Sequence, residues 1–133
     1  MNSRIEKELE ILRSFYPKVT YIENGQWVLV EDYPIPLGLS WNRQQTNICF
    51  QIPLAYPGSP PYGFYVPAGI LYEGSPPKNG YRESPDNSPP FPGTWGLFSW
   101  QHDTGWHATS DLQTGSNLIN FVRTFKDRFL EGS

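Results

Sequence analysis

Cysteine is nearly absent from this chain, which has one, Cys49, among its 133 residues. A single cysteine excludes an intramolecular disulfide and a zinc site built from cysteines. No stretch approaches the roughly 18 consecutive apolar residues of a membrane span, so we expect no membrane association. The ten Lys and Arg are scattered without a cluster and the formal net charge is −3, so a nucleic-acid interface is not expected either.

The N-terminal residues also lack the apolar core of a signal peptide, because residues 1–8 are charged throughout. Together with the shortage of cysteine, this predicts a cytoplasmic protein. His102, Asp103 and His107 supply only two imidazoles, whereas metal sites need three or four ligands at fixed geometry. We therefore expect no metal and no other cofactor.

Aromatic residues, proline and glycine are abundant. The chain contains 5 Trp, 8 Tyr and 8 Phe, with 14 Pro and 12 Gly, while charged residues make up 17%, below the usual quarter. Large side chains that need burial and many enforced turns predict one globular, loop-rich domain over residues 1–133.

Two helices are predicted, one at each end of the chain. Apolar residues recur at helical spacing over Ser3–Phe15, and Pro17 ends the pattern because a proline disfavours the α conformation of the residue before it. A second apolar stripe runs from Leu118 to Phe129, and Gly132 is placed to end that helix. An acidic side chain at Asp111 is well placed to cap the turn that leads into it.

A four-stranded antiparallel meander is predicted between the helices. Its first turn is Asn24-Gly25, the strongest short hairpin signal, in which both residues take positive φ. Five extended stretches are candidates for its strands: the hairpin pair Val19–Glu23 and Gln26–Val30, a further pair around Leu37–Trp41 and Thr46–Ile52, and the short stretch Tyr62–Val66. The order helix, meander, helix predicts an α+β domain with helices packed on the sheet.

The lone cysteine lies within one of these predicted strands. Ile48, Phe50 and Ile52 share one face of the strand and Cys49 takes the other. We expect Cys49 to be a buried, inert residue, as free cysteines usually are.

A proline-rich segment, residues 67–93, follows the meander and carries seven prolines and four glycines. We call it the flap. Irregular stretches of this length are usually functional or mobile. Its large apolar residues favour packing over a floppy insertion, and they are Ile70, Leu71, Tyr72, Tyr81 and Phe91.

The next segment, Trp95–His107, holds three Trp and two His and is the chemically densest part of the chain. His102 is a candidate general base with Asp103 beside it and Ser99 upstream, although a histidine satisfied by a backbone carbonyl fits the pattern as well. We expect Trp100 and Trp106 to fill core, because tryptophan buries a large area, and Trp95 to be the exposed one.

The order of these elements resembles the ubiquitin-conjugating (UBC) fold. The Tyr56-Pro57 and Pro60-Pro61 motif looks like the proline turn after the third strand of that fold, and Trp106 looks like its helix-leading tryptophan. Within the fold, Trp100-x-His102, Trp106, Asp111-Leu112 and the Pro34–Gly38 turn resemble the bacterial UBC-like group called prokaryotic family E. The resemblance implies structural roles for the proline turn, Trp100, Trp106 and Asp111.

The chain departs from that family at the catalytic position. An active conjugating enzyme carries its thioester cysteine after the flap, yet residues 93–105 contain none, and Phe98 and Ser99 occupy about that register. A serine ester at Ser99 requires a base, since an alcohol is a weak nucleophile at neutral pH. A serine introduced in place of a native cysteine would give the same pattern.

The resemblance implies a non-thioester module of a bacterial ubiquitin-like conjugation system, with a ubiquitin-like protein or its activating enzyme as partner. We expect that partner to dock on Trp95, Phe98 and His102. Two alternatives stay open. One is an acyl-transfer enzyme that uses His102, Asp103 and Ser99, and the other is a peptide-binding domain outside conjugation.

Overall fold

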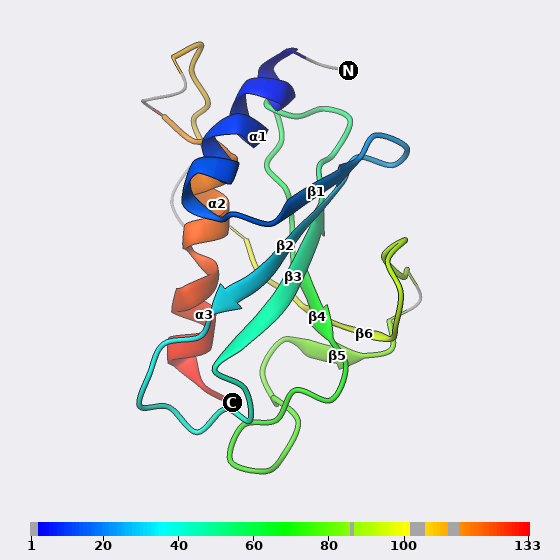
Figure 1. Cartoon of the computed structure of the whole chain (residues 1–133), viewed down its shortest axis with the longest axis vertical. Helices are drawn as coiled ribbons and strands as arrows, with labels where there is room; N and C mark the ends of the chain where they lie inside the picture. Colours follow the sequence, from blue (N-terminus) through cyan, green and yellow to red (C-terminus); the bar gives the residue numbers. More distant parts are fainter. Residues whose placement is uncertain (1–2, 86, 102–105, 112–114) are drawn as a thin grey trace.

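The computed structural model describes residues 3–85, 87–101, 106–111 and 115–133 (Figure 1). Helix α1 spans Ser3–Phe15, as its apolar spacing predicts. Ile5, Leu9 and Leu12 are buried on one side of α1, and the chain then turns into the sheet.

A six-stranded antiparallel sheet forms the centre of the fold, in the order β1-β2-β3-β4-β6-β5. Its strands are β1 (Val19–Ile22), β2 (Trp27–Pro34), β3 (Gln45–Gln51), β4 (Phe64–Pro67), β5 (Tyr81–Glu83) and β6 (Trp95–Phe98). The sequence predicts four of them. The expectation misses β5, which lies inside the flap, and β6, because strands of three or four residues beside Pro and Gly carry little periodic signal.

The loop of the hairpin between β1 and β2 is two residues longer than predicted. The last paired residues are Ile22 and Trp27, and positive φ falls on Gly25 (83°) and Gln26 (57°), not on Asn24. The four residues between the strands are closed by a hydrogen bond in which the Gln26 amide donates to the carbonyl of Glu23 at 3.0 Å.

The strand predicted over Leu37–Trp41 does not form. The pairing partner of β3 is β2, which continues past an irregularity between Val30 and Tyr33 and reaches Pro34. Asp32 has φ 59° at that point, which is the local signature of a bulge. Prolines and Gly38 after β2 break the extended pattern, so Trp41 retains only an isolated bridge to Tyr72.

The predicted C-terminal helix is present as two consecutive segments. Helix α2 spans Leu118–Arg123 and helix α3 spans Phe125–Glu131, with Thr124 between them. Gly132, at φ 78°, ends α3, as expected. The N-cap of α2 is Asn117, directly ahead of the helix, and its side chain accepts from the Asn120 amide.

All three helices lie along one face of the sheet (Figure 1). The inner core between them is dominated by aromatic side chains. Phe64 stacks on Phe125 with ring centroids 4.1 Å apart, and Phe121 meets Phe125 edge-on. Edge-on and offset contacts of this kind are the geometry that aromatic pairs prefer.

A second, smaller core, which we call the outer core, covers the opposite face of the sheet. It consists of Trp27, Cys49, Tyr65 and Trp95, with Phe91 of the flap packed against it. The flap also sends Ile70 into the inner core. Ile70 and Phe91 thus pack on the two cores, whereas most of the described residues of the flap are exposed.

Trp95 is buried, with 5% of its surface exposed, which contradicts the expected exposure. The reason is the flap. Phe91 lies edge-on to Trp95 and its carbonyl accepts the indole N–H at 3.2 Å. Trp100 and Trp106, which were expected to fill core, are half-buried and pack against the inner core.

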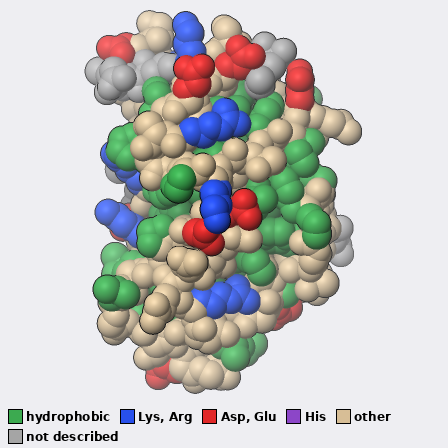
Figure 2. Space-filling view, in the orientation of Figure 1, with side chains coloured by type: hydrophobic (Ala, Val, Ile, Leu, Met, Phe, Trp, Pro, Cys, Tyr) green, Lys and Arg blue, Asp and Glu red, His purple; other side chains and the backbone are tan. Residues whose placement is uncertain are grey.

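The surface carries no dominant charge on the face in Figure 2, where Lys, Arg, Asp and Glu are interspersed with hydrophobic side chains. Among the described residues, no helix combines the length and the apolar character of a membrane span. Both observations agree with the scattered charge and short apolar runs of the sequence.

Substitution of Cys49 tests the packing of the outer core. It is fully buried in β3, and burial raises the pKa of its thiol. We expect Cys49→Ser to lower the free energy of unfolding by about 1–2 kcal/mol, because a hydroxyl replaces an apolar sulfur in a closed site. Urea denaturation measures this, with Cys49→Ala as the matched variant, and rapid labelling of the folded protein by a bulky thiol reagent would contradict the burial.

Candidate binding site around the proline turn

The segment after β6 is fixed from two sides. The Ser99 amide donates to the carbonyl of Gly80 at 2.6 Å, and the Trp100 carbonyl accepts from the Gly63 amide at 2.6 Å. The Trp100 indole donates to the Thr124 hydroxyl at 2.9 Å. The backbone of Ser99 is therefore held between the flap and the start of β4, while its side chain is exposed.

The proposed catalytic group is only partly within the described residues. His102 and Asp103 lie outside them, so their relation to Ser99 is not part of the description. Ser99 has no His, Asp or Glu hydrogen-bonded to its hydroxyl within residues 3–101. Over the described ranges, no three His, Cys, Asp or Glu side chains are grouped to hold a metal ion.

The proline turn and Trp106 lie in contact. The Trp106 indole donates to the carbonyl of Pro57 at 2.7 Å, and its ring lies 5.9 Å from that of Tyr56. Pro61 is buried and Pro60 is half-buried. The turn is thus a packed element that fixes the chain between β3 and β4.

A buried carboxylate, Glu8, holds the turn against the helices. Glu8 is 2% exposed, and its Oε1 accepts from the Tyr56 hydroxyl at 2.7 Å and from the Leu118 amide at 2.6 Å. Its Oε2 accepts from Nε of Arg4 at 2.8 Å, and another nitrogen of Arg4 donates to the carbonyl of Thr109.

The motifs of the sequence do not point to this cluster. One signal was available, because Glu8 stands three residues after Ile5 and four before Leu12, on the apolar face of α1. A charged residue on such a face is expected to have a buried partner.

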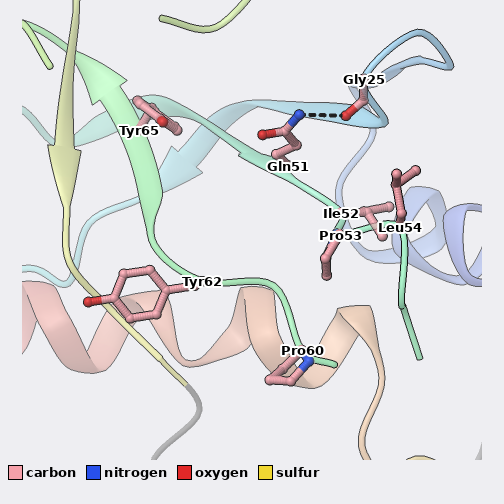
Figure 3. Close-up of a pocket in the computed structure, with 8 residues that line it drawn as sticks. All are labelled: Gly25, Gln51, Ile52, Pro53, Leu54, Pro60, Tyr62 and Tyr65. Atoms are coloured by element: carbon pink, nitrogen blue, oxygen red, sulfur yellow. Dashed lines mark hydrogen bonds between the residues drawn. The ribbon is translucent and has the colours of Figure 1, made fainter. Parts of the chain in front are cut away.

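A surface hollow of about 600 Å³ opens beside the proline turn (Figure 3). Leu54 and Tyr62 border it and are 92% and 62% exposed. On the far side, the Gln51 side chain donates to the carbonyl of Gly25 at 2.8 Å, which closes the hollow against the hairpin. Its lining is Gly25, Gln51, Ile52, Pro53, Leu54, Pro60, Tyr62 and Tyr65.

This hollow is a better contact surface than the docking residues expected from the sequence. Trp95 and Phe98 are both buried, and they belong to the outer and the inner core respectively. Side chains three apart in a strand point to opposite faces. Trp95 and Phe98 therefore form no joint surface, and the third member, His102, lies outside the described residues.

Comparison with models of protein families, with curated proteins and with solved structures gives no match for this chain. Its function is therefore argued from the residues and their geometry.

The hydroxyl of Tyr56 should contribute measurably to stability. Burial, more than the adjacent Glu8, raises the pKa of this phenol, so it stays protonated and can donate. We expect Tyr56→Phe to lower the free energy of unfolding by about 1.5–3 kcal/mol, because it removes a bond to a buried carboxylate.

The matched control is Tyr62→Phe, which removes a hydroxyl from an exposed ring and should change stability by less than about 0.5 kcal/mol. Urea denaturation of both variants gives the comparison. Equal changes in the free energy of unfolding of the two variants would show that the hydrogen bond from Tyr56 to Glu8 does not stabilise the fold.

Proposed function

We propose that this chain is a UBC-like module of a bacterial ubiquitin-like conjugation system, and that it binds a ubiquitin-like protein or its activating enzyme without forming a thioester. The order of elements supports the proposal. Helix α1 is followed by the sequential antiparallel strands β1–β4, with the Tyr56-Pro57 turn between β3 and β4. Strands β5 and β6 come next, and Trp106 lies between β6 and α2. The helix, the first four strands, the proline turn and the C-terminal helix are the elements on which the resemblance rests.

The position of the thiol carries the non-thioester part of the proposal. Cys49 lies in the middle of β3, fully buried in the outer core, and burial raises the pKa of its thiol. A thioester needs an accessible thiolate. The exposed residue after β6, where the resemblance places the catalytic group, is Ser99.

Two observations bear on where the partner binds. The hollow beside the proline turn exposes Leu54 and Tyr62, and the residue after Tyr62, Gly63, is hydrogen-bonded to Trp100. The apolar surface thus adjoins the segment after β6. Exposed apolar groups next to a fixed backbone are typical of protein contact surfaces.

The same hollow also supports a peptide-binding domain outside conjugation, because tyrosine and proline side chains line it and extended peptides dock in such grooves. The gene neighbourhood separates the two functions. The conjugation role requires a ubiquitin-like protein or an activating-enzyme homologue encoded beside this gene, and the peptide-binding role does not.

No thioester should form on this chain. We expect no reductant-sensitive adduct on a non-reducing gel after incubation with the neighbouring ubiquitin-like protein, its activating enzyme and ATP. An adduct that reductant removes and that Cys49→Ala abolishes would overturn the proposal. An adduct that resists reductant and disappears in Ser99→Ala would assign acyl transfer to Ser99 instead.

Binding should depend on the hollow beside the proline turn. We expect Leu54→Ala and Tyr62→Ala each to weaken binding of the ubiquitin-like protein or the activating enzyme about tenfold, measured by calorimetry. Leu130→Ala, at another exposed leucine that lines neither hollow, is the control and should leave binding unchanged. Absence of a complex with either protein would refute the proposed function.

A further inference from the structure

A second hollow, of about 460 Å³, lies between the end of α1, the loop after β2 and the C-terminal helices. Figure 1 shows the end of β2 and the cyan loop after it running beside α3. The hollow is lined by Tyr16, Tyr33, Pro34, Ile35, Pro36, Leu37, Arg123 and Lys126. Its volume is in the range of ordinary ligand pockets.

The floor of this hollow is apolar and rigid. Tyr33 and Ile35 are buried, and the Tyr33 hydroxyl donates to the carbonyl of Val122 at 2.8 Å. Tyr16 stacks on Tyr33 with ring centroids 5.5 Å apart. The Ile35 amide donates to the carbonyl of Gln44 at 3.0 Å, so the floor is set before a ligand arrives, which lowers the entropic cost of binding.

One leucine stands open at the rim. Leu37 is 87% exposed and follows Pro36, whose ring restricts the backbone there. On the opposite side, the guanidinium carbon of Arg123 lies 4.5 Å from the centroid of the Phe15 ring. The exposed ring of Phe15 thus continues the apolar surface past the hollow.

The charged side chains of the lining have one sign. Arg123 and Lys126 line the hollow and no acidic residue does. Neither cation is in a salt bridge with another residue of the described ranges. The charge of Arg123 reaches the floor, since it opposes the rise that burial causes in the pKa of Tyr16.

One acidic residue of α3, Asp127, acts on the floor of the hollow. Asp127 helps to raise the pKa of Tyr33, although less than burial and Tyr16 do. Asp127 is exposed and does not line the hollow. In a chain of net charge −3, two cations over an apolar floor are a local feature that complements a negatively charged, apolar ligand.

We infer that this hollow binds an acidic peptide segment of a partner protein. A leucine or aromatic side chain of the peptide enters between Tyr16, Ile35 and Leu37, and flanking carboxylates pair with Arg123 and Lys126. The apolar contact supplies affinity and the two charge pairs select the sequence. The inference does not depend on the proposed conjugation role, because the site lies at the other end of β2 from the hollow beside the proline turn.

A random peptide library displayed on phage and selected on the full chain tests this inference. We expect enriched sequences to combine Asp or Glu with an adjacent large apolar residue. The enriched peptide, synthesised with a fluorescent label, then gives a Kd by anisotropy. Enrichment of uncharged or basic sequences, or no enrichment, would overturn the inference.

Variants locate the peptide. Leu37→Ala, and Arg123→Gln combined with Lys126→Gln, should each weaken binding about tenfold, and higher ionic strength should weaken it further. Leu130→Ala and Lys78→Gln are matched controls for an exposed leucine and an exposed cation elsewhere, and neither should change the Kd. Equal losses in the controls would place the peptide elsewhere.

Folding and self-association are measured on the same proteins. Arg123 contacts Phe15, so thermal unfolding checks each variant, and Lys126→Gln alone carries the charge test if Arg123→Gln destabilises the fold. Sedimentation velocity tests the other occupant. A dimer of the full chain that Leu37→Ala dissociates would assign the hollow to a second copy and overturn the peptide site.

Discussion

A single buried carboxylate, Glu8, ties together three parts of the chain that the sheet alone would leave independent. Burial of a carboxylate costs several kcal/mol even after relaxation. Three hydrogen bonds to Glu8 offset this cost, and they are donated by Arg4, Tyr56 and the amide of Leu118. Hydrogen bonds to a charged group contribute about 1.5–3 kcal/mol each, so the cluster is stable only when all three parts are in place.

The geometry of the site follows from that requirement. Tyr56 and Pro57 are held to α1 by Glu8, and Trp106 is held to Pro57. The proline turn therefore has one position relative to α1 and α2. The hollow beside it keeps its shape because the same turn supplies Pro60 and Tyr62 to its lining.

Aromatic side chains fix the C-terminal helices in a second way. Tyr33, Trp41 and Trp100 each bury an apolar ring and donate one hydrogen bond to the helical segment. The acceptors are the carbonyls of Val122 and Phe129 and the hydroxyl of Thr124. Each residue thus contributes both buried apolar area and a directional hydrogen bond. The high aromatic content of the chain serves in part to hold the C-terminal helices in this way.

Local patterns in the sequence predict the local parts of this fold. The bounds of α1 follow from apolar spacing and Pro17, and the two faces of β3 follow from the alternation around Cys49. No such local pattern predicts the β5–β6 pair. A Cβ at Gly96 would overlap the Tyr81 hydroxyl, so β6 carries a glycine for the sake of a neighbour 15 positions away, and the strand signal is lost.

Long-range contacts also explain why the candidate site was only half predicted. The proline turn and Trp106 are readable as motifs, but the partner of Glu8 in α2 lies 110 residues away. The exposure of Trp95 could not be judged from its own segment either. It depends on Phe91, which the flap brings over the sheet.

Each hollow has an exposed leucine held on fixed backbone. Leu37 and Leu54 stand at opposite ends of β2, and burial of each would contribute about 1.5–3 kcal/mol. Both are kept in water by backbone that is itself fixed. The amide of Ile35 is bonded to Gln44, and the Gln26 side chain donates to the carbonyls of Ile52 and Pro53. In a flexible loop, such a leucine would pack onto the nearest apolar surface. A fixed one holds it where only another molecule can cover it, which is why the exposure at both hollows points to binding.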